Sequence, residues 1–306
     1  MFTLMLSKPS LMVSQIKLFK IQYNRRSANK YGWKPQWFDA DCFNSQLVEN
    51  IKIFQLKNEL KDDGLVGPQT YRRIYTIRDA LSEPGNRIFC NSLPVQVDGA
   101  NVRVDQIQQG CYKKVNTTRR PITLVTHWDV CLSADSCKRV LEKRNISTHF
   151  VIDNDGTIVQ LLDCNDIAWH AGNRRVNNTS IGIDFSNAFY LRYQRTYKSR
   201  GFGERPILNG SEVHGRTLDL HLGYYPAQLK AYSALVNALT KHYNISLECP
   251  LTEEGELVTT VDKTAAAGKF NGVVCHYHLT KRKIDTAGLE LDEILKDLRQ
   301  RRASED

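Results

Sequence analysis

Histidines and aspartates that could bind one catalytic metal ion gather in three short segments of the sequence. These segments are Leu124–Asp129, Ala168–Gly172 and Val274–Asp285. Zinc in a hydrolytic site takes three protein ligands from His, Cys, Asp or Glu and leaves the fourth position for water. His127, His276 and Asp285 fit that count, and we expect them to bind one zinc ion. His278 is a rival ligand at close spacing.

The residues around these ligands indicate how the ligands would be positioned. His127 ends a β-branched run that begins at Ile122, and His276 ends the run Gly272–Cys275. Side chains at the ends of strands have rigid positions, and two neighbouring strands would bring both rings together. Asp285 follows His276 across a lysine-rich loop and can complete the triangle as the third ligand.

A zinc hydrolase also needs groups that stabilise charge and transfer protons. Zinc polarises a carbonyl oxygen and lowers the pKa of bound water from about 15.7 to about 7. A nearby cation then stabilises the oxyanion, and Lys283 is the candidate for that task. For the proton carrier we favour Asp184, because strand-like alternation sends Ile181 and Ile183 to one face and Asp184 to the other. The alternative for Asp184 is a salt bridge, or support of a zinc-binding histidine.

Further polar and aromatic residues close to these segments are candidates for contact with a substrate. His149 and His170 could contact the substrate or transfer a proton. Trp128 and Trp169 could offer flat faces to a sugar or a peptide, and burial in the core is the alternative for both.

The hydrophobic pattern predicts the elements that must position these residues. Strands alternate with helices after Pro121, which favours an α/β fold with a mixed central β-sheet flanked by helices. The predicted strands are Ile122–Thr126, Phe150–Asp153, Thr157–Leu162 and Ile181–Phe185, and the predicted helices are Ser133–Glu142, Pro226–Tyr243 and Leu289–Arg301. Asp155-Gly156 is typical of a hairpin turn.

The first 79 residues have a different pattern and predict a small, all-helical domain. Apolar residues recur at helical spacing from Gln15 to about Ile77. Weak patterning over residues 80–120 indicates a linker, which packs loosely or begins the second domain. Residues 121–306 would form the catalytic domain, and residues 191–223, rich in arginine, tyrosine and glycine, would be a surface insertion in it.

Composition limits the classes of protein and partner. The 306 residues are 41% hydrophobic, which is enough apolar material for two domains. A formal net charge of +9 favours a polyanionic partner such as nucleic acid, an anionic membrane or a bacterial envelope. Eight scattered cysteines without a CxxC pair indicate free thiols in a reduced cytoplasm. The first nine residues do not resemble a signal peptide, and we expect no membrane span.

Five motifs in order make the second half of the chain similar to a known family. They are Val125–Trp128, Ser147–Thr157, Ala168–Gly172, Ser180–Asn187 and Cys275–Asp285. With these motifs the chain resembles the type 2 N-acetylmuramoyl-L-alanine amidases, which are relatives of the peptidoglycan recognition proteins and of phage endolysins. The resemblance covers roughly residues 121–288.

The resemblance implies particular tasks for residues of this chain. It implies that His127, His276 and Asp285 hold zinc and that Lys283 points at the reacting carbonyl. The chain departs from the family at two positions. The family usually has Glu where this chain has Asp184. Many members have Tyr where it has Thr148.

The N-terminal segment carries a second resemblance. Val48–Gln55 followed by Leu60–Thr70 is similar to the helical peptidoglycan-binding domain of lytic enzymes. Gly64 and Gly67 permit backbone conformations closed to other residues, and Pro68 starts the next helix. The residues of this turn are therefore explained first by folding. Binding to the cell wall is implied by the family, and a purely structural helical cap is the alternative.

Together the two resemblances imply a bacteriolytic, zinc-dependent amidase. Its substrate would be the amide between the lactyl group of N-acetylmuramic acid and L-alanine in bacterial peptidoglycan. It would act as a monomeric phage endolysin that stays in the host cytoplasm until it is released to the wall. The alternatives are a non-catalytic peptidoglycan-binding protein, a peptidase that cuts the stem peptide, and a nucleic-acid-binding protein using Lys281–Lys283. No nucleic-acid-binding motif accompanies these basic residues, so we expect no nucleic acid partner.

Overall fold

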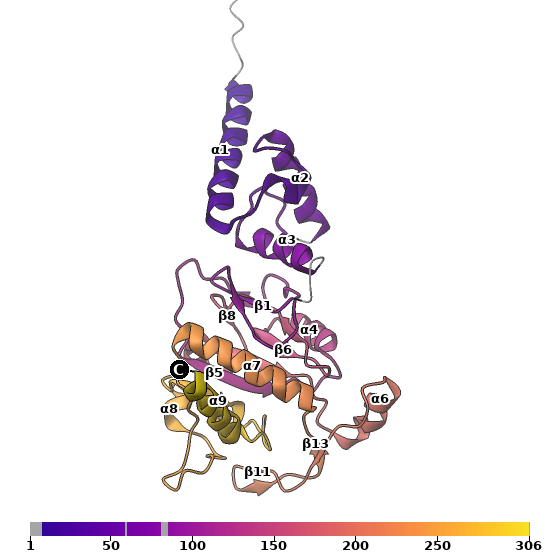
Figure 1. The fold of residues 1–306 in the computed structure, drawn as a ribbon, viewed down its shortest axis with the longest axis vertical. Coiled ribbons are helices and arrows are strands. Elements are labelled where there is room, and N and C mark those ends of the chain that lie inside the picture. Colours follow the sequence, from indigo (N-terminus) through magenta and orange to yellow (C-terminus); the bar gives the residue numbers. More distant parts are fainter. Residues whose placement is uncertain (1–7, 59, 81–84, 306) are drawn as a thin grey trace, which may run out of the picture. The chain divides into compact units, whose positions relative to one another are not determined.

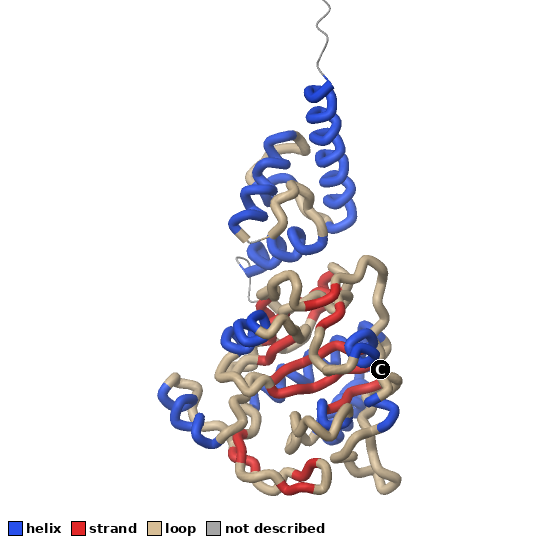
Figure 2. The backbone as a smooth tube through the Cα atoms, turned by 180° about the vertical axis from the view of Figure 1, so that it is seen from behind, coloured by secondary structure: helices blue, strands red, loops and turns tan. Residues whose placement is uncertain are grey.

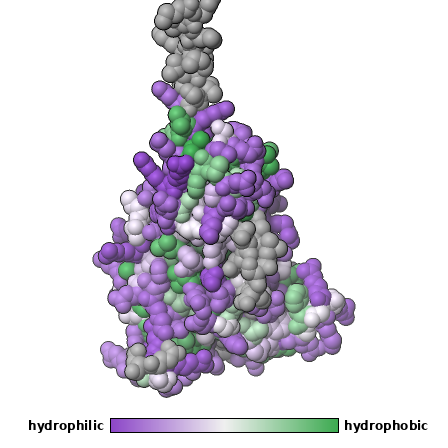
Figure 3. All heavy atoms as spheres, turned by 45° about the horizontal axis from the view of Figure 1, so that its top comes forward, coloured by the Kyte–Doolittle hydropathy of each residue, from purple (hydrophilic) through white to green (hydrophobic). Residues whose placement is uncertain are grey.

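The computed structural model describes residues 8–58, 60–80 and 85–305, and the chain divides into two compact units, Met1–Glu83 and Pro84–Asp306 (Figure 1). The first seven residues, on which the expected absence of a signal peptide largely rests, lie outside the described residues. In the described ranges, no helix has the length and apolar character needed to cross a membrane. On the face seen in Figure 3, hydrophilic side chains predominate and hydrophobic ones form small separate groups.

The first unit is helical, as predicted. Its elements are α1 (Lys8–Tyr31), the 3-10 turn η1 (Pro35–Phe38), α2 (Ser45–Lys57) and α3 (Pro68–Ala80). Leu47 and Ile51 lie one turn apart on α2, and both are fully buried together with Val66. This apolar stripe is the helical periodicity that the sequence displays.

Buried polar side chains hold the turn between α2 and α3. The side-chain oxygen of Gln55 accepts the N–H of Gly64 at 2.8 Å, and its amide donates to the Leu65 carbonyl and the Thr70 hydroxyl, each at 3.0 Å. Gly64 has φ 72°, and a Cβ there would lie 2.8 Å from Cγ1 of Val48. The folding of this turn therefore explains why the sequence has glutamine, glycine and threonine at these positions.

A six-stranded mixed sheet forms the centre of the second unit, as predicted. The strand order is β14-β5-β9-β6-β7-β3. The strands are β3 (Val102–Val104), β5 (Thr123–Trp128), β6 (Phe150–Ile152), β7 (Ile158–Gln160), β9 (Ser180–Phe185) and β14 (Gly272–Cys275). Neighbouring strands are parallel except β6 and β7, which form an antiparallel hairpin across Asp155-Gly156. Figure 2 shows these strands running between helices of the same unit.

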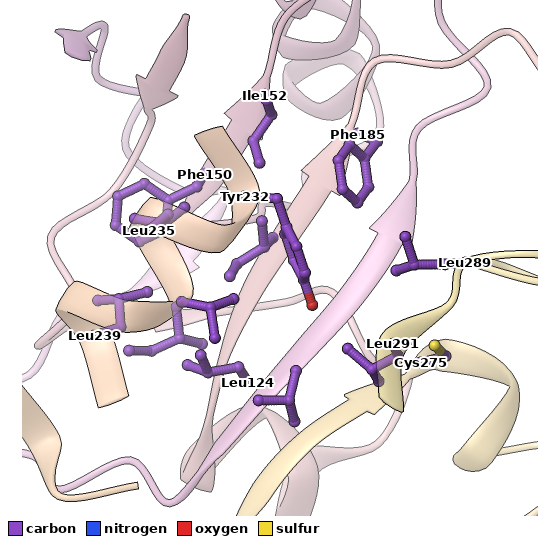
Figure 4. Close-up of a cluster of buried hydrophobic side chains, with 14 of the residues drawn as sticks. Leu124, Phe150, Ile152, Phe185, Tyr232, Leu235, Leu239, Cys275, Leu289 and Leu291 are labelled. Atoms are coloured by element: carbon purple, nitrogen blue, oxygen red, sulfur yellow. The ribbon is translucent and has the colours of Figure 1, made fainter. Parts of the chain in front are cut away.

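Two long helices cover one face of this sheet. They are α7 (Pro226–Tyr243) and α9 (Leu291–Glu305). Their apolar side chains meet those of the strands in the main core (Figure 4), where each fully buried Leu, Ile or Phe stabilises the fold by about 1.5–3 kcal/mol. The labelled members of this core are Leu124, Phe150, Ile152, Phe185, Tyr232, Leu235, Leu239, Cys275, Leu289 and Leu291.

Shorter helices lie against the other face. They are α4 (Ala134–Lys143), α5 (Arg174–Thr179) and α8 (Lys263–Ala266). Val125 of β5 packs on this side, whereas Leu124 packs in the main core. Since side chains alternate along a strand, His127 shares the face of Val125. On β9, Ile181 and Ile183 lie in the main core, so Asp184 is directed to the other face, as the alternation of these residues predicted.

Of the two possibilities for residues 80–120, the described residues from 85 onward fit the second, because they begin the second unit and do not form a loosely packed linker. They contain the hairpin of β1 (Arg87–Cys90) and β2 (Leu93–Gln96), the edge strand β3, and β4 (Tyr112–Lys113), which pairs with β8 (Ile167–Ala168). Ile88, Cys90 and Val97 lie in the main core. Strands of two to four residues leave no sustained apolar run, which is why sequence periodicity did not reveal them.

Residues 191–223 form short helices and two-stranded ribbons. The elements are η2 (Leu191–Tyr193), α6 (Gln194–Ser199), β10 (Ile207–Leu208), β11 (Glu212–Val213), β12 (Arg216–Thr217) and β13 (His221–Leu222). The buried guanidinium of Arg205 lies between the rings of Tyr197 and Tyr225, at 4.6 and 4.4 Å, and donates to the carbonyls of Ser186 and Gly223. Arg205 and Tyr197 therefore anchor the segment to the sheet. This part of the predicted surface insertion is buried.

Candidate metal centre and its pocket

The register of the sheet brings His127 and His276 together. Thr126 of β5 pairs with Cys275 of β14, so His127 and His276, the residues that follow them, lie side by side at this end of the two strands. The two Nδ1 atoms lie 2.9 Å apart, and Oδ2 of Asp285 lies 3.2 Å from Nδ1 of His127 and 2.9 Å from Nδ1 of His276. All three side chains are buried.

The three atoms suit a divalent metal in type and spacing, and His127 and Asp285 suit it in protonation state as well. Ligands about 2.0–2.1 Å from a tetrahedral zinc are separated by about 3.3 Å, close to the distances in this cluster. Burial and the neighbouring His276 lower the pKa of His127 to about 4, so its ring is neutral at pH 7. Burial alone would raise the pKa of Asp285, but its interactions with the side chains of His127 and His276 bring it below the ordinary value. Neutral imidazole and ionised carboxylate are the forms that bind metals.

A chain of hydrogen bonds orients His127. The Ser180 hydroxyl donates to the Val176 carbonyl at 2.6 Å, so its oxygen accepts from Nε2–H of His170 at 3.0 Å. Nδ1 of His170 is then an acceptor for Nε2–H of His127, at 2.9 Å. This arrangement leaves Nδ1 of His127 unprotonated and directed at His276 and Asp285. His170, expected to contact the substrate or transfer a proton, thus lies where it orients the candidate ligand His127.

Gly182 makes room for His170. A Cβ on Gly182 would lie 2.8 Å from Cγ of His170 and 2.7 Å from Oγ1 of Thr148. Sequence reasoning did not identify this position, although a glycine inside a strand often marks a close approach of another group.

A pocket of about 620 Å³ opens at the candidate metal cluster of His127, His276 and Asp285 and contains most of the predicted site residues. Asp184 pairs with His127 in the register of β5 and β9 and lines this pocket. Burial raises the pKa of Asp184 well above its ordinary value, and the carboxyls of Asp129 and Asp285 raise it further. Within the described ranges, no ion pair or hydrogen bond to the Asp184 side chain is present, so the alternative of a salt bridge receives no support.

Lys283 and Trp169 form part of the more exposed wall of the pocket. Lys283 is exposed, and its backbone carbonyl accepts a hydrogen bond from the ring of His214 at 2.9 Å. Trp169 is 37% exposed and also lines a second pocket of about 620 Å³, together with Lys113 and Arg174. An exposed indole bordered by cations can contact a sugar ring or an anionic peptide.

The structure does not bring His149 into the pocket. Its Nδ1 accepts the N–H of Gly182 at 3.0 Å, and its Nε2–H donates to the Asp166 carbonyl at 3.1 Å. The ring is fully buried, and burial lowers its pKa to about 3. Both nitrogens serve the fold, so we leave His149 out of the proposed catalytic groups.

His278 and Trp128 also have structural surroundings. Nδ1 of His278 accepts the N–H of Cys275 at 2.9 Å, and Nε2 donates to the Val258 carbonyl at 2.6 Å, so neither nitrogen joins the metal cluster. Trp128 borders the pocket but is buried in the main core, with its ring 4.8 Å from that of Phe189. Packing explains Trp128 more directly than contact with a substrate.

Comparison with known proteins decides the family. A family model described as N-acetylmuramoyl-L-alanine amidase matches residues 117–287, which is more than half of the chain. The chain belongs to the N-acetylmuramoyl-L-alanine amidase family. The matched residues include both histidines and the aspartate of the metal cluster, Asp184 and Lys283. No curated protein sequence gives a significant match.

Several solved structures of amidases are similar to this chain. A selenomethionine derivative of AmpD is 18% identical, with 64% of this chain and 93% of AmpD covered and a TM-score of 0.38. AmiD from E. coli, in complex with anhydro-N-acetylmuramic acid-L-Ala-D-γ-Glu-L-Lys, is 20% identical, with 70% and 65% covered and a TM-score of 0.38. A mutant endolysin from Bacillus subtilis is 18% identical, with 65% and 99% covered and the same TM-score. The family assignment rests on the family model.

Proposed function

We propose that this protein is a zinc-dependent N-acetylmuramoyl-L-alanine amidase that hydrolyses the amide between the lactyl group of N-acetylmuramic acid and L-alanine in bacterial peptidoglycan. One observation carries the proposal. In a chain of this family, Nδ1 of His127, Nδ1 of His276 and Oδ2 of Asp285 converge at one pocket, with the His127 ring neutral and the Asp285 carboxyl ionised, which are the forms that bind zinc.

The pocket supplies the remaining groups that such a hydrolysis needs. Zinc held by these ligands would activate water at neutral pH and polarise the amide carbonyl. Lys283 would stabilise negative charge on the carbonyl oxygen, a contribution worth about 100-fold to 1,000-fold in rate. Asp184, whose raised pKa favours the protonated form, would deliver a proton to the leaving amine of L-alanine. Trp169 would contact the sugar or the stem peptide.

We further propose that the protein acts as a phage endolysin, with the helical unit binding the cell wall. The turn of that unit, with Gln55, Gly64 and Thr70, has the pattern of peptidoglycan-binding domains, and tethering raises the effective concentration of substrate. The net charge of +9 suits the anionic envelope. The eight cysteines are free thiols, which accords with residence in the host cytoplasm until release to the wall.

Zinc dependence has a direct test. Protein treated with a chelator should lose hydrolysis of purified peptidoglycan and regain it with stoichiometric zinc. The His276→Ala variant should stay inactive after zinc is restored. The matched control is His278→Gln, which changes a histidine of the same turn outside the metal cluster and should recover activity. Full hydrolysis by the chelated protein would show that the metal is not required.

A further inference from the structure

A second group of metal-binding side chains lines the same pocket. Asp129, Cys131 and Cys137 offer one carboxylate oxygen and two sulfurs, and these atoms all lie within 4.8 Å of one another. Asp129 follows β5, Cys131 lies in the next loop, and Cys137 lies in α4. All three line the pocket that contains the His127 cluster. None of the three has a task in the proposed amide hydrolysis.

The carboxylate of Asp129 is fixed in position by the surrounding chain. Its Oδ1 accepts the backbone N–H of Cys131 at 2.8 Å and that of Asn187 at 3.1 Å. Its Oδ2 accepts the hydroxyl of Ser186 at 3.1 Å, and the carboxyl also interacts with the thiol of Cys137. Hydrogen bonds of this kind orient metal-binding carboxylates. The Asp129 side chain is therefore pre-organised beside both sulfurs.

Charge near the two thiols favours a cation. The carboxylate of Asp129 lies within 4.8 Å of both sulfurs, and Asp184 lines the same pocket. A divalent cation compensates these carboxylates and lets the thiols ionise as they bind.

We propose that Asp129, Cys131 and Cys137 form a second metal site, separate from the His127, His276 and Asp285 cluster, that binds a thiophilic divalent ion such as zinc or cadmium. Two thiolates and one carboxylate are a ligand set that selects such ions over magnesium or calcium. Three protein ligands leave one position open, and the half-buried Cys131 gives the ion access from the pocket.

Occupancy of this site has a consequence for catalysis that rests on the proposed amidase function. The ion would lie in the pocket that receives the substrate, beside Asp184, whose carboxyl interacts with that of Asp129. Excess zinc should therefore inhibit peptidoglycan hydrolysis by the wild type more strongly than by Cys137→Ala. Binding of the ion itself is measured without any hydrolysis, so the failure of one proposal can be told from the failure of the other.

Cobalt titration of the full, reduced chain tests the site directly. Cobalt bound by thiolate gives a near-ultraviolet charge-transfer band, whereas cobalt bound by two histidines and an aspartate gives only weak visible bands. We expect a thiolate band with the second equivalent of cobalt in the wild type. The band should be lost in Cys137→Ala and in the milder Cys131→Ser, and kept in His276→Ala and in Cys42→Ser, which removes an exposed thiol elsewhere.

Three results would overturn the proposal. One is the absence of a thiolate band at any cobalt concentration in protein whose thiols are shown to be free by alkylation. Another is a band that persists in both cysteine variants, which would place the metal elsewhere. The last is a disulfide between Cys131 and Cys137 in protein purified without reductant, because the sulfurs would then be unavailable. Visible bands from the first equivalent verify that each cysteine variant is folded.

Discussion

His170 should control how tightly the protein binds zinc, although it is not a ligand. Its Nδ1 accepts from Nε2–H of His127 at 2.9 Å, and its own Nε2–H is fixed by Ser180 at 3.0 Å. In His170→Ala the buried Nε2–H of His127 loses its acceptor, and a group left unsatisfied in this way costs about 1–3 kcal/mol. The ring is then free to rotate or to change tautomer, either of which removes the lone pair on Nδ1 from the cluster.

The expected loss is 10-fold to 100-fold in zinc affinity, the range found when a supporting partner of a metal-binding histidine is removed. This corresponds to about 1.4–2.8 kcal/mol, in line with the cost of one unsatisfied donor. The dissociation constant is measured at neutral pH by competition with a chromophoric chelator. The matched control is Trp169→Ala, which changes the exposed neighbour and should leave zinc affinity within twofold.

Two results would refute the reasoning about His170. Equal zinc affinity of His170→Ala and the wild type would mean that the hydrogen bond does not orient His127. If Trp169→Ala weakened zinc binding as much as His170→Ala, any change in this segment would disturb the site. The hydrogen bond between His170 and His127 would then have no particular effect on zinc affinity.

Three further predictions concern charge stabilisation, packing and pH. Lys283→Gln should lower kcat for peptidoglycan about 100-fold to 1,000-fold with zinc affinity unchanged, and a fall below fivefold in steady-state assays would argue against oxyanion stabilisation. Gly182→Ala places a Cβ 2.8 Å from His170 and 2.7 Å from Thr148, so zinc binding measured by chelator competition should weaken. Zinc affinity equal to that of the wild type would mean that both side chains can move aside at no cost. Burial, with a smaller effect from Arg119, lowers the pKa of His149 from 6.5 to about 3, so between these values the unfolded chain binds a proton that the folded chain does not. This histidine should therefore reduce the unfolding free energy as pH falls below about 6.5, by on the order of 1.4 kcal/mol per pH unit. The unfolding free energy is measured by urea denaturation, and a value at pH 5 equal to or greater than the value at pH 7 would contradict this prediction.

The sequence predicted best what depends on local pattern. Alternation in Ile181–Asp184 gave the face of Asp184, and the long amphipathic run Pro226–Tyr243 gave α7 to the residue. Histidines at the ends of two β-branched runs could be expected to meet, because parallel neighbouring strands end at the same edge of the sheet. The first two inferences use the spacing of side chains on one face, which is 2 residues in a strand and 3.6 in a helix.

Features that depend on long-range contacts were beyond the sequence. His149 and His170 are similar in local pattern, yet one is enclosed by Gly182 and Asp166 while the other contacts His127. The short strands β3 and β4 pair with the distant strands β7 and β8, so their own residues carry a weak signal.

The measurement that tests the central claim most directly is the identification of the bond that is cut. Purified peptidoglycan is digested with the zinc-loaded protein, and the new amino groups and the fragment masses are determined, with His276→Ala as the matched control. We predict free L-alanine amino groups on intact stem peptides and intact glycan chains, and no such products with the variant. New amino groups from within the stem peptide would mean a peptidase instead, and binding to the wall without any zinc-dependent cleavage would leave a non-catalytic recognition protein.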